Sequence, residues 1–247
     1  MRKLVLFILI AFLGFSHVYA QEVNIVSDDS YLLAINDNEF EGLTEADANT
    51  TSNLFLNKVS LAIIGGINFT TLTGDDADSF DCLTCFHVGI AAMVPISELF
   101  AVQPELIYAC MGSKYSEGGY IEPIETSGRT LTGDLSGTYK LNYLLLPVMA
   151  KYEVVKGLSL EAGPQVGFLL SAEDDYEFMG TSMTEDVKDF TKSIDFAFNA
   201  GVGYKFDAGY HVRARYMLGL TDVTDFEEPS TAKWKNSGAF ISVGYFF

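Results

Sequence analysis

"IDFAFNAGVGYKF", residues 194–206, decides the fold because apolar residues alternate with small or polar residues along its whole length. A repeat of two residues places every second side chain on the same face, which is typical of a β-strand whose faces meet different surroundings. One face is apolar, and the other is small and polar. The apolar face consists of Ile194, Phe196, Phe198, Ala200, Val202, Tyr204 and Phe206.

The same alternation recurs on both sides of this stretch. Gly65 interrupts the alternation in the first segment, and the segment at 138–152 is the least regular, because Leu144, Leu145 and Leu146 follow one another without a polar residue between them. Segments of this length and pattern predict an all-β protein. The eight predicted strands lie at 59–69, 86–94, 100–110, 138–152, 158–170, 194–206, 210–221 and 239–247.

The connections between the predicted strands alternate in length. Those after the second, fourth and sixth strands are short, at 95–99, 153–157 and 207–209. Those after the first, third, fifth and seventh are long and carry many of the acidic residues. Short turns at one end and long loops at the other are typical of outer-membrane barrels. The long connections lie at about 70–84, 113–137, 172–192 and 222–236.

Eight strands fit a closed barrel in two ways, which differ in the face that points inward. A soluble lipocalin-like ligand-binding barrel would turn the apolar face inward. A membrane barrel would turn it outward against lipid and keep the small and charged face in a narrow lumen. The many glycines of the second face, the asymmetry of the connections and the aromatic residues near strand ends favour the membrane. We therefore predict an eight-stranded antiparallel up-and-down transmembrane β-barrel.

The last strand extends the alternation through ISVGYFF, residues 241–247, to a final aromatic residue. Unpaired backbone groups are costly in lipid, so we expect this strand to pair with the first strand and close the cylinder. An even number of strands then places both mature termini in the periplasm.

Several stretches carry a family resemblance: LNYLLLPVMAKYE (141–153), LEAGPQVGFLLSA (160–172), GVGYKF (201–206), QPELIYACMG (103–112) and the closing ISVGYFF. They resemble the Bacteroidetes outer-membrane β-barrel family, often called PorT-like, over about residues 58–247. The resemblance implies an eight-stranded barrel in the outer membrane of a Gram-negative bacterium. The terminal aromatic residues, Tyr245 and Phe247, resemble the signal that the outer-membrane assembly machinery recognises.

The chain divides into three parts by composition. Residues 1–20 combine a basic start, a run of 12 apolar residues and a Val-Tyr-Ala cleavage site, which together predict a secretory signal peptide. Residues 21–57 are acidic and read as a flexible N-terminal segment, and residues 58–247 form the barrel. The chain carries 33 acidic and 15 basic residues, a net charge of −18, which argues against nucleic acid as a partner.

Five charged residues fall on the lumen side of the predicted strands. Charges that share so narrow an interior must pair or stay hydrated, so they predict either a salt-bridged plug or a selective pore, and the plug is favoured. Glu161 and Arg213 fall at comparable depth and are candidates to pair. The predicted lumen charge network consists of Glu105, Lys151, Glu161, Arg213 and Arg215.

Other chemistry-bearing residues give weaker signals. Cys82 and Cys85 form a CxxC motif without further metal ligands, so a small loop disulfide or two reduced thiols is expected, while Cys110 is expected to pack against lipid. His87 and His211 face the lumen at different heights, which does not suggest a shared catalytic site. We therefore predict no enzymatic activity, no metal site and no cofactor.

The function predicted from the sequence is structural or surface-binding, through long acidic extracellular loops. The partners expected are outer-membrane lipid and the assembly machinery. An accessory role in a PorT-like protein secretion machinery, with secretion or envelope proteins as partners, is the alternative that the resemblance implies.

Overall fold

The computed structural model describes residues 59–74, 77–124, 129–225 and 233–247. The predicted signal peptide and the acidic N-terminal segment lie outside the described residues.

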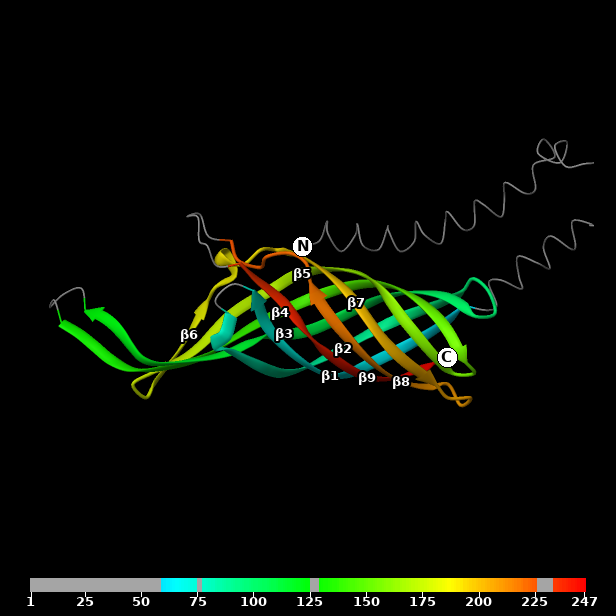
Figure 1. Ribbon diagram of the computed structural model, residues 1–247, viewed down its shortest axis with the longest axis horizontal. Helices are drawn as coiled ribbons and strands as arrows, with labels where there is room; N and C mark the ends of the chain where they lie inside the picture. Colours follow the sequence, from blue (N-terminus) through cyan, green and yellow to red (C-terminus); the bar gives the residue numbers. More distant parts are fainter. Residues whose placement is uncertain (1–58, 75–76, 125–128, 226–232) are drawn as a thin grey trace, which may run out of the picture. The chain divides into compact units, whose positions relative to one another are not determined.

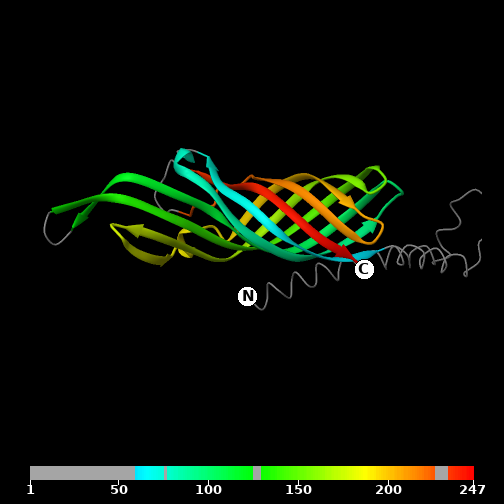
Figure 2. The same cartoon turned by 90° about the horizontal axis from the view of Figure 1, so that it is seen from below.

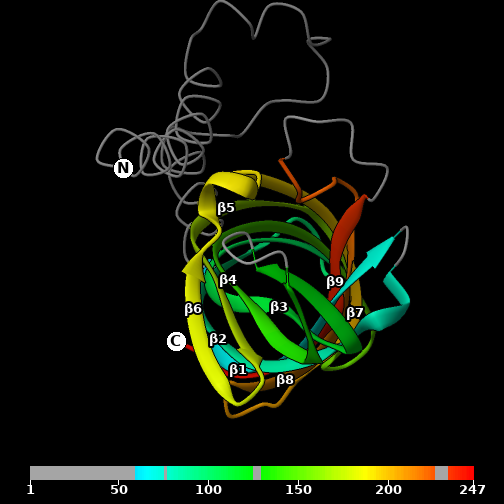
Figure 3. The same ribbon diagram turned by 90° about the vertical axis from the view of Figure 1, so that its left-hand side faces the viewer.

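The described residues form one closed antiparallel barrel (Figures 1 and 3). Each of eight strands pairs with the next one around the ring, and the first strand pairs with the last, so the ring has no open edge. One further strand, β6 (Thr181–Asp186), pairs only with β5 and lies outside the ring. The predicted fold class is therefore confirmed. The ring consists of β1 (Ser60–Gly74), β2 (Phe80–Pro95), β3 (Phe100–Ile124), β4 (Arg129–Val155), β5 (Leu158–Phe178), β7 (Ile194–Lys205), β8 (Tyr210–Gly219) and β9 (Trp234–Phe246).

The outer surface of the barrel is apolar. Large apolar side chains such as Ile63, Ile241 and Val243 are 54%, 49% and 60% exposed, while the alternate positions of the same strands are buried in the lumen. A soluble barrel would bury these side chains, because a contiguous apolar surface of this extent is rare on soluble monomers. The lipocalin-like alternative therefore does not fit the observed faces.

The two ends of the barrel differ. At one end, called the turn end, short connections join β2 to β3, β4 to β5 and β7 to β8. At the other, called the hairpin end, β3 and β4 continue together as one long hairpin and β5 continues into β6 (Figures 1 and 2). Polar side chains replace apolar ones on the outer face toward the hairpin end: Asn142 bonds Ser171, and Lys140 pairs with Asp175.

The hairpin end corrects the sequence-based boundaries. Residues 113–137 and 172–192 are predicted as long loops, but most of them are paired β-strand. A strand that extends beyond the membrane meets water on both faces, so its sequence no longer alternates and gives no strand signal. Its backbone groups are nevertheless paired by the neighbouring strand.

The interior above the turn end is a packed core. Ile64, Met111, Tyr143 and Leu145 are each at most 1% exposed and belong to one apolar cluster inside the ring. Leu144 and Leu146 point the other way, so the three leucines keep the alternation that the sequence seems to lose. The apparent break arises because both faces are apolar where the lumen is filled by core side chains.

Candidate functional site

The five predicted lumen residues lie together near the turn end, in what we call the charge plug (Glu105, Lys151, Glu161, Arg213 and Arg215). The carboxylate of Glu105, on β3, is 1% exposed and lies opposite β8. The guanidinium of Arg213 donates to both of its oxygens, at 2.6 and 3.1 Å. Two parallel hydrogen bonds of this kind fix the orientation of both groups.

Arg215 connects the two carboxylates of the plug. Its terminal nitrogens donate to Glu105 at 2.7 and 2.8 Å. Its Nε donates to Glu161 Oε1 at 2.7 Å, and Nη2 donates to Oε2 of the same residue at 3.0 Å. Arg215 is therefore the bridge of the plug, and Glu105 is its most heavily bonded carboxylate.

Lys151, on β4, completes the plug, and Gln103, on β3, hydrogen-bonds to it. The Lys151 ammonium lies 3.4 Å from Glu161 Oε2 and donates to Gln103 Oε1 at 3.3 Å. The amide of Gln103 in turn donates to Glu105. The structure brings all five predicted residues together, but Arg213 pairs with Glu105 rather than Glu161. Strand tilt shifts heights around a barrel, so depth counted along each strand misplaces partners.

The lumen beside the plug holds little free space. A cavity of about 10 Å³ lies between His87, Gln165 and Arg213, which is the size of one water molecule. His87 bonds Ser242 at 2.8 Å, and His211 packs on the ring of Phe246. The two histidines do not meet, and the plug and core together fill the barrel interior around them.

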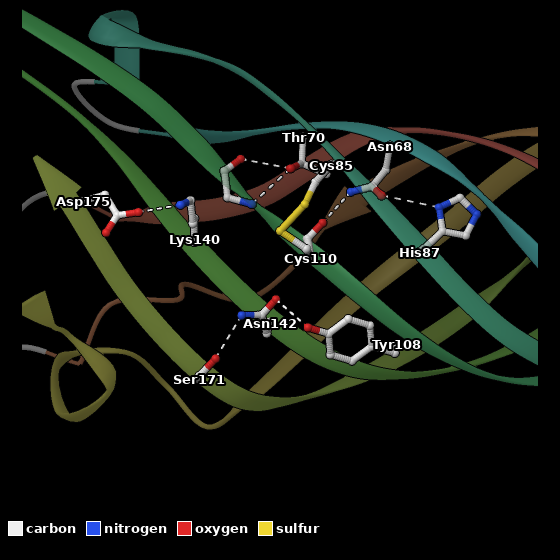
Figure 4. Close-up of a disulfide and its surroundings, with 11 residues drawn as sticks. Asn68, Thr70, Cys85, His87, Tyr108, Cys110, Lys140, Asn142, Ser171 and Asp175 are labelled. Carbon is white, nitrogen blue, oxygen red and sulfur yellow. Dashed lines mark hydrogen bonds and ion pairs between the residues drawn. A yellow bond between two sulfur atoms is a disulfide. The ribbon is translucent and has the colours of Figure 1, made fainter. Parts of the chain in front are cut away.

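The cysteines pair differently from the sequence-based expectation. Cys85 on β2 forms a disulfide with Cys110 on β3 (Figure 4). The thiol of Cys82 is free and exposed. The expectation that Cys110 packs against lipid is therefore wrong. The β2–β3 register slips between Cys82 and His87, and this irregularity brings together two side chains that parity places on different faces.

A second polar region, called the vestibule, lies at the hairpin end. It is a cavity of about 420 Å³ with walls from β2, β3, β4, β5 and β9. Four aromatic rings lie in contact along it: Phe80 packs edge-on against Trp234 at 4.9 Å, and Tyr115 lies 5.0 Å from Tyr139. The residues around it are Ser79, Phe80, Tyr115, Ser116, Glu117, Leu135, Tyr139, Asp174, Tyr176, Phe178 and Trp234.

The electrostatics of the vestibule are set by Asp174. Its side chain is 9% exposed, and the hydroxyl of Tyr115 donates to its two oxygens at 3.0 and 3.1 Å. Burial raises the pKa of Asp174, the Tyr115 hydrogen bond partly lowers it, and the charges of Glu185 and Asp175 raise it again. Sequence reasoning missed this site, because its residues come from five strands and share no motif.

The two residues predicted as an assembly signal lie on the outer face where the barrel closes. Tyr245 packs against Tyr210 of β8 at 5.1 Å, and the backbone N–H of Phe247 donates to the carbonyl of Leu61 on β1. Phe247 is 72% exposed. The structure thus places both aromatic side chains against the surroundings of the barrel.

Within the described residues, no cluster of His, Cys, Asp and Glu side chains has the arrangement of a metal site. No helix in this part of the chain is long and apolar enough to cross a membrane.

Comparison with known proteins gives the family. Residues 44–225 match the model of a family described as outer membrane protein beta-barrel domain. The match covers well over half of the chain, so the chain belongs to this family and is an integral outer-membrane β-barrel protein. No curated protein matches the chain.

Solved structures of outer-membrane barrels are similar at low identity. Neisserial surface protein A is 11% identical, with a TM-score of 0.46 over 76% of this chain and 99% of that one. Ail, the attachment invasion locus protein of Yersinia pestis, is 12% identical, with a TM-score of 0.44 over 76% and 98%. OprG from Pseudomonas aeruginosa is 12% identical, with a TM-score of 0.40 over 76% and 95%.

Proposed function

We propose that this protein is a closed outer-membrane barrel that presents its hairpin end on the cell surface and binds a ligand there. The observation that carries the proposal is the contrast between a filled lumen and a walled cavity at the hairpin end. The charge plug and the apolar core occupy the barrel interior, whereas the vestibule holds about 420 Å³ of space. Binding sites for small molecules are typically cavities of about 300–1,000 Å³.

The proposed orientation places the turn end in the periplasm and the hairpin end outside. Outer-membrane barrels have short periplasmic turns and longer extracellular loops. An epitope inserted between β5 and β6, at Met179–Gly180, should be accessible to antibody on intact cells. The same epitope between β7 and β8, after Asp207, should be accessible only after the outer membrane is opened. The reverse pattern of labelling would contradict the orientation.

The proposed closure of the lumen is tested by conductance. The purified barrel in a planar bilayer should show no steady ion current, because the plug residues are buried and bonded to one another. A steady current through the wild-type protein would show that the lumen is a channel and would refute this part of the proposal.

The assembly role of Tyr245 and Phe247 is part of the same proposal. Replacing both by Ser should reduce the amount of heat-modifiable, folded barrel in membranes, while Tyr204→Ser, an outward aromatic on β7, should have a smaller effect. Equal losses in the two variants would indicate lipid packing rather than recognition. We expect no enzymatic activity from any of these regions.

The PorT-like resemblance of the strand sequences supports one alternative, an accessory role in a secretion machinery. Affinity capture of the tagged protein from native membranes distinguishes the two roles. Stable recovery of secretion components would favour the alternative, and their absence together with ligand binding at the vestibule would favour the surface-binding role.

A further inference from the structure

Four aromatic rings in contact with one another line the vestibule, and we call this set the cage. Phe80, Tyr139 and Trp234 lie within 6.5 Å of one another by ring centroids, and Tyr115 stacks at a tilt on Tyr139. The rings come from β2, β3, β4 and β9, so the cage forms only when the barrel has closed. The faces of such rings carry partial negative charge and attract cations.

The charges around the cavity all have the same sign. The described lining residues include two carboxylates, Asp174 and Glu117, and no Lys, Arg or His. Asp174 is the deeper of the two, and the single Tyr115 hydroxyl is shared between both of its oxygens. A buried carboxylate is ordinarily paired with a cation or receives several hydrogen bonds.

The neighbouring residue on β5, Asp175, is a carboxylate whose charge is balanced by a cation. Asp175 points to the outer face, where it pairs with the Lys140 ammonium and accepts a hydrogen bond from Thr184. Among the described residues, Asp174 has no cationic partner and accepts a hydrogen bond only from the Tyr115 hydroxyl, and it lies against the cavity. The described lining residues therefore lack a positively charged group beside Asp174.

We propose that the vestibule binds a small organic cation, whose ammonium or quaternary ammonium group lies between the aromatic rings and the carboxylate of Asp174. The proposal rests on the surface-binding role inferred above and names its ligand class. An anionic ligand would meet two carboxylates without a counter-charge. A neutral sugar could use the rings and hydroxyls but would leave Asp174 uncompensated.

The protein offers an internal reporter for this test, because Trp234 is its single tryptophan and lines the cavity. The probe is acetylcholine, paired with its neutral carbon isostere 3,3-dimethylbutyl acetate, with maltose as a sugar control. We expect acetylcholine to change the Trp234 fluorescence of the full-length barrel in detergent and to give a saturable isotherm by calorimetry. The isostere should bind at least about tenfold more weakly, because it lacks the charge.

Two variants place the charge requirement at one residue. Asp174→Asn keeps the shape of the side chain and should weaken acetylcholine binding by about tenfold or more, since a buried charge pair is lost. Glu173→Gln, an exposed position on the same strand, should leave the affinity unchanged. Equal binding of the isostere, no binding of acetylcholine, binding of maltose alone, or an unchanged affinity in Asp174→Asn would each overturn the proposal.

This titration in detergent does not depend on which end of the barrel faces the medium. Epitope labelling on cells tests the orientation separately. A barrel that binds the cation but labels in the reverse orientation would refute the proposed function and leave the ligand class standing.

Discussion

Glu105 in the charge plug and Asp174 in the vestibule are both buried carboxylates, but their surroundings differ. Glu105 receives four hydrogen bonds from two arginines, whereas Asp174 shares one hydroxyl between its two oxygens. A carboxylate with full compensation stabilises the fold only while its partners stay in place. A carboxylate with incomplete compensation costs stability and is available to a ligand. The difference separates the structural end of this barrel from the end that we propose to bind a ligand.

The largest expected effect is at Glu105. Glu105→Ala removes the carboxylate that both arginines share, so we expect the free energy of unfolding to fall by about 3–5 kcal/mol. Urea unfolding of the barrel in detergent, followed by Trp234 fluorescence, measures this change. Glu98→Ala, an exposed position in the β2–β3 turn, is the control.

A second variant separates pairing from packing at the plug. The double change Glu105→Met with Arg213→Met should cost less than the sum of the single changes, because no unpaired charge remains between these two positions. Additive losses would mean that Glu105 and Arg213 do not act as a pair, and the contrast with the vestibule would fail.

The disulfide between the two regions should have the next largest effect. Cys110 lies on β3 between Glu105 and Tyr115, and its bond to Cys85 spans 25 residues. Cys85→Ser with Cys110→Ser should lower the free energy of unfolding by about 3 kcal/mol, because a cross-link of this span restricts the unfolded chain. Cys82→Ser should have little effect, since its thiol is free and exposed.

Thiol titration of the unfolded, unreduced protein checks the pairing directly. One reactive thiol per chain is expected, from Cys82. Three reactive thiols would show that the bond is absent, and the stability comparison would then have no basis.

The smallest expected effect is at Asp174 itself. Asp174→Asn should change the free energy of unfolding at neutral pH by less than about 1 kcal/mol, or raise it, because a poorly compensated charge is removed. The same stability measurement applies. A loss as large as that of Glu105→Ala would mean that Asp174 is a structural partner and would remove the contrast between the two regions.

The pH dependence at Asp174 follows from the raised pKa. The folded protein binds the proton more tightly than the unfolded chain, so acidification through the folded pKa should add stability, until the unfolded carboxyl also becomes protonated. The wild type should therefore gain stability on mild acidification relative to Asp174→Asn. The titratable groups around it that both proteins share are Tyr115, Glu117, Tyr139, Asp175, Tyr176 and Glu185. Cation binding should weaken over the same range, because it needs the ionised carboxylate.

Alternation identified the membrane-crossing parts of the barrel because lipid and lumen impose opposite demands on successive residues. Residues 194–206 show this most clearly, since β7 follows the predicted faces from Ile194 to Tyr204. The same reasoning selected the five plug residues by parity. It did not predict which of these residues pair with one another, because strand tilt changes which residues lie at the same depth on opposite sides of the barrel.

The hairpin end escaped prediction for a different reason. Residues 113–124 and 129–137 pair as β3 and β4 where water replaces lipid, so nothing forces their side chains to alternate. The disulfide depends on a one-residue slip between strands, which composition does not reveal. The vestibule depends on residues far apart in the chain, such as Phe80 and Trp234, which become neighbours only through the closing pair of strands.

That closing pair also governs how the barrel can be assembled. β1 and β9 are paired although they are far apart in the sequence. The hydroxyl of Thr73, for example, donates a hydrogen bond to the carbonyl of Lys235, which lies 162 residues further along the chain. Contacts between residues so far apart in sequence form late and slowly during folding. Until β9 arrives, β1 exposes an unpaired edge that would recruit other strands. The free edge of β1 must therefore be shielded until the seven further strands of the ring have formed and β9 pairs with it.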